Sequence, residues 1–393
     1  MTLLFGQTEL NKRMIGILLL LLLLVLLILL FRFFSRTNAI HVINNLGGNI
    51  YPILSQMKSL KQTYNPTPWL FNGHIHTVYG MRYRKRSKIL NSCKRELFTF
   101  SDGGTSALDM FDSPTIPEDA PLVIINPTLG GGTREPVINN LTENLIKKGF
   151  RVVVANARGC SGAPITSARL SCGADYDDIE ETLHHLREKY HPSYVFIAGF
   201  SLGALQSLCF SAYSEKLDKD GLSPVAGIVC VSHLYNNIEG AYQLDEFPQN
   251  ILYLKVMLKQ LCHIVKKNKF VNYPDIDKCQ TLHDFDDVFT AKIRGFESAN
   301  EYYKKASAYD KIKLCQVPTL LISADDDPFT QKRFHPVKEV SESTNVALVH
   351  TAEGGHVSFV SGFNGQSSLL DFVIPDFFQS IINMDKNGPP KWK

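Results

Sequence analysis

The chain has 393 residues, of which 44% are hydrophobic and 20% charged, a composition typical of a globular protein with a sizeable core. Its 41 basic and 38 acidic residues give a net charge of +3, which argues against nucleic acid as the main partner. The 8 cysteines form no C-x-x-C pairs, which argues against a zinc site and against a dense disulfide framework.

The first predicted element is an apolar segment from Met14 to Phe31 without a charged residue. A helix of this length, about 27 Å at about 1.5 Å per residue, nearly spans a bilayer. The alternative is a cleaved signal peptide, whose apolar part is usually about 7–15 residues long and ends at a small-residue cleavage site. We expect a signal-anchor at 14–34 after a tail at 1–13, with the protein in the endoplasmic reticulum, another endomembrane or the plasma membrane.

A lead-in at 35–64 precedes a region in which the pattern predicts eight strands. Residues 96–111 predict two strands joined by an Asp-Gly-Gly turn. Six apolar runs follow, at 122–126, 151–157, 194–200, 225–232, 318–324 and 345–351. Helical spacing between them, as at 135–149 and 175–190, predicts a mostly parallel sheet with helices on both faces.

The alternation of strands and helices stops between 236 and 316. There the chain is rich in amphipathic helix, with Ile251, Leu254, Leu258 and Leu261 at three-to-four spacing. We expect 236–316 to be a helical cap inserted after the sixth strand, and 65–235 with 317–393 to form the core. Further apolar residues on the helix predict a second apolar neighbour, either a cap helix at 298–308 or a bound acyl chain.

The segment GFSLG places Ser201 between two glycines directly after a predicted strand. This is the pattern of a nucleophile elbow, although a lone serine in such a pattern is more often a turn residue. Three acids, Asp325 to Asp327, follow the seventh predicted strand, and only one of them can orient a base; His356 follows the eighth strand. The order Ser201, Asp327, His356 is that of α/β-hydrolases, so we predict a nucleophile, an orienting acid and a base.

A glycine-rich loop and a pair of histidines also bear on the predicted site. The glycine-rich loop NPTLGGGT follows the third strand, and we expect the backbone N–H groups of Leu129 and Leu202 to form an oxyanion hole. His74 and His76 would lie on one face of a strand, but they have no nearby acidic or cysteine partner. We therefore expect neither a metal nor a cofactor.

With these motifs in place, the chain resembles the AB hydrolase 4 branch of the α/β-hydrolase superfamily, and is most similar to the membrane-anchored lipases numbered one and three. The resemblance runs from Trp69 to Gly365 and rests on PWLFNGHIHT, NARGCSGAPITSAR, GFSLGA, SADDDPF and GGHVSF. It implies the same triad, with the acid directly before Pro328. One departure is Thr128, where the family's oxyanion loop usually has glycine.

These observations predict a membrane-anchored serine hydrolase that cleaves lipid esters, either monoacylglycerols or phospholipids, through an acyl-serine. The expected partners are the lipid ester and the membrane, and the oligomeric state stays open. One alternative is an acyl-CoA:alcohol O-acyltransferase with the same triad. Another is a noncatalytic lipid receptor, which would need no complete triad.

Overall fold

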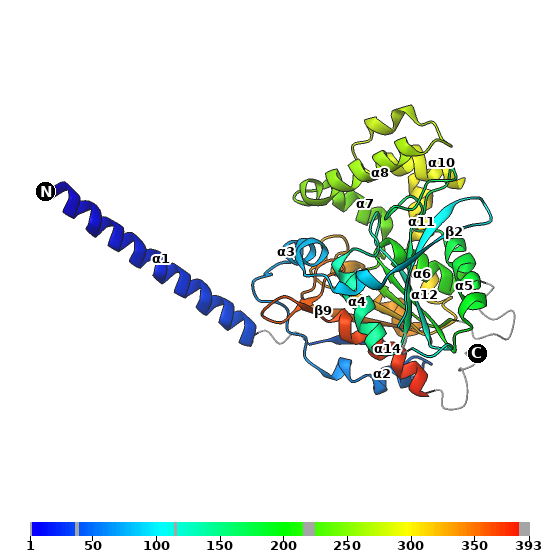
Figure 1. The fold of residues 1–393 in the computed structure, drawn as a ribbon, viewed down its shortest axis with the longest axis horizontal. Coiled ribbons are helices and arrows are strands. Elements are labelled where there is room, and N and C mark those ends of the chain that lie inside the picture. Colours follow the sequence, from blue (N-terminus) through cyan, green and yellow to red (C-terminus); the bar gives the residue numbers. More distant parts are fainter. Residues whose placement is uncertain (1, 36–38, 114–115, 215–224, 385–393) are drawn as a thin grey trace.

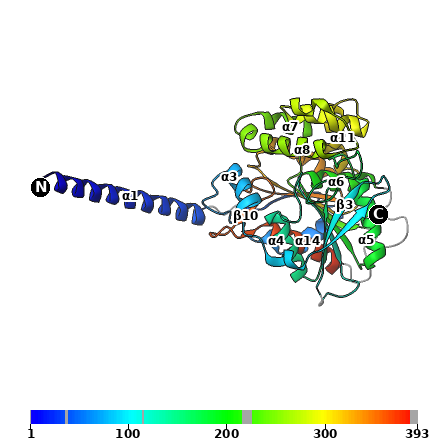
Figure 2. The ribbon, with the colours of Figure 1, turned by 45° about the horizontal axis from the view of Figure 1, so that its top comes forward.

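A computed structural model describes residues 2–35, 39–113, 116–214 and 225–384 of the chain. The predicted regions also include positions outside these ranges, namely 1, 36–38, 114–115, 215–224 and 385–393. The helix α1, Thr2–Ser35, projects away from the folded domain (Figures 1 and 2). Its segment Asn11–Phe31 has a mean hydropathy of 3.5 and none of it is buried. This helix is long and apolar enough to cross a membrane, a test that a signal sequence also passes.

The domain is built on a nine-stranded sheet in the order β1-β9-β8-β7-β6-β4-β5-β3-β2. The strands β9, β8, β7, β6, β4 and β5, which follow one another in the middle of the sheet, are parallel. At the edges, β1 pairs antiparallel with β9, β3 with β5, and β2 with β3. The strands are β1 His41–Asn44, β2 Lys94–Thr99, β3 Thr105–Phe111, β4 Leu122–Asn126, β5 Arg151–Asn156, β6 Val195–Phe200, β7 Val225–Val231, β8 Thr319–Ala324 and β9 Val346–Thr351. A small pair, β10 Val360–Ser361 and β11 Ser367–Ser368, lies apart.

The α/β-hydrolase fold predicted from the sequence is confirmed, but the number of strands in the main sheet was wrong by one. The extra strand, β1, comes from the lead-in and pairs with β9 from His41 to Asn44. With four residues and one polar end, it lacks the long apolar run that marked the other strands. It covers the edge of β9, which would otherwise expose unpaired backbone groups.

Helices cover both faces of the sheet, because alternate residues of each strand point to opposite sides. In β4, Val123 and Ile125 pack into the core under α2, α4 and α14, while Ile124 packs into the core under α5, α6, α12 and α13. These helices are α2 Tyr51–Gln56, α4 Pro136–Lys147, α5 Asp177–Tyr190, α6 Leu202–Tyr213, α12 Tyr309–Ile312, α13 Val337–Glu342 and α14 Leu370–Met384. The central strands β4, β6, β7 and β8 are buried throughout.

A group of helices between β7 and β8 lies above the sheet, where the cap was expected (Figures 1 and 2). It contains α7 Asn237–Asp245, η5 Asn250–Leu254, α8 Lys255–Lys267, η6 Pro274–Lys278, α9 Leu282–Phe285, η7 Asp286–Thr290, α10 Ala291–Arg294 and α11 Ala299–Ala306. We call these helices the cap. The apolar face of α8, with Leu258 and Leu261, packs on Phe285 and Phe289 of the following helices. The apolar neighbour of this face is therefore the segment with Phe285 and Phe289, and not the helix at 298–308 that the sequence suggested.

Candidate active site

Ser201 lies on the sharp turn between β6 and α6, with φ 52° and ψ −111°. Such a backbone conformation is strained for a residue with a side chain and is found mainly at functional sites. Both flanking glycines are required by close packing. A Cβ on Gly203 would lie 2.1 Å from the carbonyl oxygen of Asn126, and one on Gly199 would lie 2.3 Å from the carbonyl oxygen of Gly203. The two glycines therefore let α6 begin directly against β4 and β6.

The structure brings the three predicted triad residues into one chain of hydrogen bonds. Nε2 of His356 lies 2.9 Å from Oγ of Ser201. Its Nδ1 lies 2.9 Å from Oδ2 and 3.1 Å from Oδ1 of Asp327. Asp327 Oδ1 also accepts the backbone N–H of Phe329 at 2.8 Å. Asp327 is thus anchored by its own loop and turns both carboxylate oxygens toward the imidazole, with Oδ2 the nearer.

The other two acids of the Asp-Asp-Asp run have different partners. Asp326 Oδ1 accepts the backbone N–H groups of Gly354 and Gly355, at 2.9 and 2.8 Å, and so ties the acid loop to the histidine loop. Burial, with the charge of Asp327 in addition, raises the pKa of Asp326 to about 6. Asp325 points elsewhere and pairs with Nδ1 of His350 at 2.8 Å and Nζ of Lys332 at 2.6 Å.

Residues 73–78 form the helix α3, Gly73–Val78, rather than the strand that the His-x-His pattern suggested. Residues two apart on a helix point in different directions, so His74 and His76 do not converge on a common ligand. His76 is buried, its Nε2 lies 3.0 Å from the carbonyl oxygen of Val360, and burial lowers its pKa to about 4. His74 Nδ1 contacts the hydroxyl of Tyr253 at 3.2 Å. Both histidines have structural partners.

The same helix positions the catalytic candidate His356. The Oγ1 of Thr77 accepts the backbone N–H of His356 at 2.8 Å and donates to the carbonyl oxygen of Gly73 at 2.6 Å. Gly73 itself packs so closely on the acid loop that a Cβ there would overlap the carbonyl oxygen of Asp326. Helix α3 therefore holds the acid loop and the histidine loop in a fixed relation.

The predicted oxyanion donors, Leu129 and Leu202, both line the pocket that contains Ser201. Leu202 is the first residue of α6, where a backbone N–H has no partner inside the helix. The Leu129 loop is closed by Thr128, whose Oγ1 donates to Glu135 at 2.6 Å, while the other carboxylate oxygen of Glu135 accepts the N–H of Gly132 at 3.1 Å. Burial raises the pKa of Glu135.

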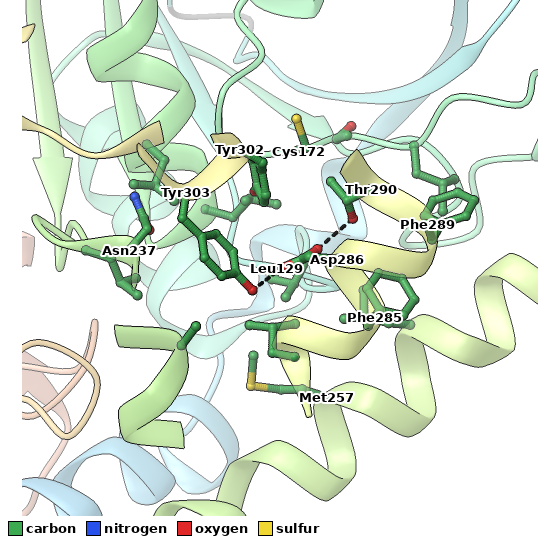
Figure 3. Close-up of a pocket in the computed structure, with 18 of the residues that line it drawn as sticks. Leu129, Cys172, Asn237, Met257, Phe285, Asp286, Phe289, Thr290, Tyr302 and Tyr303 are labelled. Carbon is green, nitrogen blue, oxygen red and sulfur yellow. Dashed lines mark hydrogen bonds between the residues drawn. The ribbon is translucent and has the colours of Figure 1, made fainter. Parts of the chain in front are cut away.

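The pocket lies between the sheet and the cap (Figure 3). Its cavity volume is about 120 Å³, and all the empty space up to the open mouth amounts to about 930 Å³. Ser201 lies at one part of its wall, and most of the remaining lining is apolar, including Met257, Phe285, Phe289 and Phe329. The Phe329 ring also packs on the His356 imidazole, with centroids 4.3 Å apart. The geometry offers a nucleophile and a base beside an apolar binding site.

One group of potential metal ligands occurs outside the pocket. Asp325, His335 and His350 each place a ligand atom within 4.8 Å of the others. Burial lowers the pKa of His335 to about 4. The Asp325 carboxylate already accepts hydrogen bonds from Lys332 and His350, and the Lys332 ammonium balances its charge without an ion.

Three residues that organise the site were not singled out from the sequence: Thr77, Glu135 and Phe329. Thr77 falls inside the GHIHT motif and Phe329 inside DDDPF, so the motifs contained both residues without revealing their roles. For Glu135 the sequence gives no signal, because its partner Thr128 is reached only through the fold of the loop.

Comparisons with known proteins agree with this fold. A family model described as alpha/beta hydrolase fold matches residues 121–363. An abhydrolase domain-containing protein from Dictyostelium discoideum is 32% identical over 330 residues, which cover 82% of this chain and 82% of that protein. Phospholipase ABHD3 of Homo sapiens is 29% identical, with 82% of this chain and 80% of that protein covered.

The chain is also similar to a yeast protein named for its enzymatic activity and to a solved esterase structure. Medium-chain fatty acid ethyl ester synthase/esterase 2 of Saccharomyces cerevisiae is 26% identical, with 79% of this chain and 84% of that protein covered. An esterase structure from Pyrococcus furiosus superposes with a TM-score of 0.50 at 14% identity, covering 77% of this chain and 98% of that one. At this identity the structural similarity indicates a common fold.

Proposed function

Because the chain belongs to the α/β-hydrolase fold family, we propose that it is a membrane-anchored serine hydrolase that cleaves carboxylic ester bonds of lipids. The observation that carries this proposal is the hydrogen-bonded chain from Ser201 through His356 to Asp327, which opens into a largely apolar pocket. A noncatalytic lipid receptor would need the pocket but not the chain of hydrogen bonds.

The geometry supports a two-step reaction through an acyl-serine. Ser201 Oγ attacks the ester carbonyl carbon while His356 Nε2 accepts its proton, and Asp327 stabilises the resulting imidazolium. The N–H groups of Leu129 and Leu202 donate to the oxyanion of the tetrahedral intermediate. The alcohol leaves with the proton from His356. Water then attacks the acyl-serine, His356 takes its proton, and the fatty acid leaves as Ser201 regains a hydrogen.

The lipid nature of the substrate is supported by the pocket and by the names of relatives. Aliphatic and aromatic side chains from the cap and core surround the space beside Ser201, which suits an acyl chain. Relatives named as a phospholipase and as a fatty acid ethyl ester synthase/esterase point in the same direction. Helix α1 would keep the enzyme in the membrane in which such substrates lie.

Acyl transfer to an alcohol is a second candidate, favoured by the name of the yeast relative. The same acyl-serine would form, and an alcohol in place of water would attack it. The two reactions differ only in the final acceptor, so the products of one assay with added alcohol separate them.

The proposal is tested with the full-length protein in detergent and a fluorophosphonate probe, which labels activated serines. We expect labelling of the wild type, loss of labelling in Ser201→Ala, and retention in Ser171→Ala, which changes another serine that lines the pocket. The same proteins are then given monoacylglycerol and phospholipid in mixed micelles, with and without ethanol. Free fatty acid indicates hydrolysis and ethyl ester indicates transfer, whereas lipid binding without turnover would favour a receptor and overturn the proposal.

A further inference from the structure

Part of the cap wall of the pocket carries a polar side chain without a partner. Asn237, at the start of α7, is only 6% exposed and lines the pocket. Its Nδ2 amide group has no hydrogen-bond acceptor among the residues that the structure describes. A buried donor without an acceptor destabilises the folded chain. Such a group needs an explanation, and a ligand in the pocket is one.

The fold does not need this amide. The N-cap of α7 is Asn236, whose side chain accepts the backbone N–H of Glu239 at 3.2 Å. The backbone N–H of Asn237 donates to Oγ of Ser307. Helix α7 is therefore capped and tied to the end of α11 without the Asn237 side chain, which is left facing the pocket.

A carboxylate lies in the same pocket wall (Figure 3). Asp286 accepts a hydrogen bond from Oγ1 of Thr290 at 2.6 Å on one oxygen and from the hydroxyl of Tyr303 at 2.7 Å on the other. Each carboxylate oxygen has two lone pairs, so each retains capacity for one more donor. Tyr303 and Asn237 both line the pocket, from the neighbouring cap helices α11 and α7 (Figure 3).

These two groups have complementary demands. The Asn237 amide offers a hydrogen and lacks an acceptor, whereas the Asp286 carboxylate can accept another hydrogen. A hydroxyl group is both donor and acceptor, so it satisfies either demand. A phosphate or a second carboxylate offers no donor when ionised, and the Asp286 charge repels it. The cation in the lining, Arg294, is already paired with Asp175. The rest of the wall is largely apolar, which strengthens a hydrogen bond made inside it.

We propose that Asn237 and Asp286 form a subsite for a hydroxyl-bearing lipid ester, in which Asn237 Nδ2 donates to a hydroxyl oxygen and the Asp286 carboxylate accepts from a hydroxyl hydrogen. This inference rests on the proposed function, since it names the class of ester that the hydrolase prefers. The hydroxyl belongs either to the alcohol part of the ester, as in a glycerol monoester, or to the acyl chain.

The test compares esters that differ only in hydroxyl groups. Monooctanoylglycerol and propyl octanoate share an acyl chain and a three-carbon alcohol, and propyl 8-hydroxyoctanoate moves the hydroxyl to the chain end. We expect the full-length wild type to prefer one of the two hydroxyl esters over propyl octanoate. Asn237→Leu should lower kcat/KM for that ester about tenfold, the loss of one hydrogen bond, and change propyl octanoate less than about twofold. Asp286→Asn should also lower kcat/KM for that ester.

The matched control is Asn300→Leu, the same exchange at an exposed position of α11 outside the pocket lining. It should change neither kcat/KM. Fluorophosphonate labelling of Ser201 reports whether each variant is folded, and Asn237→Ala replaces the leucine variant if that protein is not labelled. The hydroxyl ester that the wild type cleaves with the higher kcat/KM shows whether the hydroxyl belongs to the alcohol part or to the acyl chain.

Two results would overturn the subsite alone: equal kcat/KM for all three esters in the wild type, or an equal loss on all of them in Asn237→Leu. Ser201-dependent cleavage of propyl octanoate would still uphold the proposed function in both cases. If no ester is cleaved, the proposed function fails and the subsite fails with it.

Discussion

The exchange Asp327→Asn tests the chain of hydrogen bonds most directly. Asp327 Oδ1 accepts the backbone N–H of Phe329 at 2.8 Å, so an asparagine keeps its carbonyl oxygen at that position. Its amide nitrogen then occupies the place of Oδ2, which lies 2.9 Å from Nδ1 of His356. An N–H donor there makes Nδ1 an acceptor and puts the imidazole proton on Nε2, which faces Ser201 and can no longer act as a base.

Loss of the correct tautomer in a triad of this kind lowers kcat by ~10⁴, equivalent to about 5.5 kcal/mol of transition-state stabilisation. The assay is the hydrolysis of p-nitrophenyl butyrate by full-length protein in detergent, with fold checked by thermal unfolding. Asp326→Asn is the matched control, because an amide oxygen can still accept the N–H groups of Gly354 and Gly355, and it should lose less than about tenfold. A folded Asp327→Asn protein within tenfold of the wild type would refute the reasoning, and so would a crippling effect of Asp326→Asn.

Three other predictions concern the pocket and the anchor. Burial raises the pKa of Asp286 to about 6, above its value in the unfolded chain, so its ionisation costs stability as the pH rises from about 4 to 6. Relative to Asp286→Asn, the wild type should lose about 3 kcal/mol of unfolding free energy across that window, measured by denaturant titration, and a pH-independent difference would contradict this. In a series of p-nitrophenyl esters with acyl chains of two to sixteen carbons, kcat/KM should rise about fourfold per added CH₂ until the pocket is full. Met257→Trp should shorten the chain length at which kcat/KM is highest. A preference for the acetate ester would rule out an acyl-chain site. The protein should stay in membranes during carbonate extraction because of residues 14–31, whereas a soluble, shortened chain would indicate a signal peptide.

The fold was predictable because the sheet is buried on both faces. Largely apolar strands such as 122–126 and 195–200, which are buried throughout, leave little ambiguity about a parallel sheet between helices. The meeting of Ser201 and His356 with an acid from the run 325–327 was predictable because parallel strands bring their carboxyl ends to one edge. The choice of Asp327 among the three acids depended on the family resemblance. The strand β1 escaped prediction because it is short, partly exposed and recognisable only through its pairing with β9.

The supporting contacts were not predictable because each joins segments that the sequence does not relate. Thr77 holds His356 across 279 positions of the chain, and nothing in the local pattern of GHIHT identifies its partner. At Thr128, comparison with the family's usual glycine indicated a departure in the oxyanion loop, but not its physical meaning. In the structure the threonine hydroxyl donates to a buried Glu135, which also accepts the N–H of Gly132. The side chain that replaces glycine thus supplies a hydrogen bond that closes the loop, and the flexibility needed for the turn is provided by Gly130, with φ 68°.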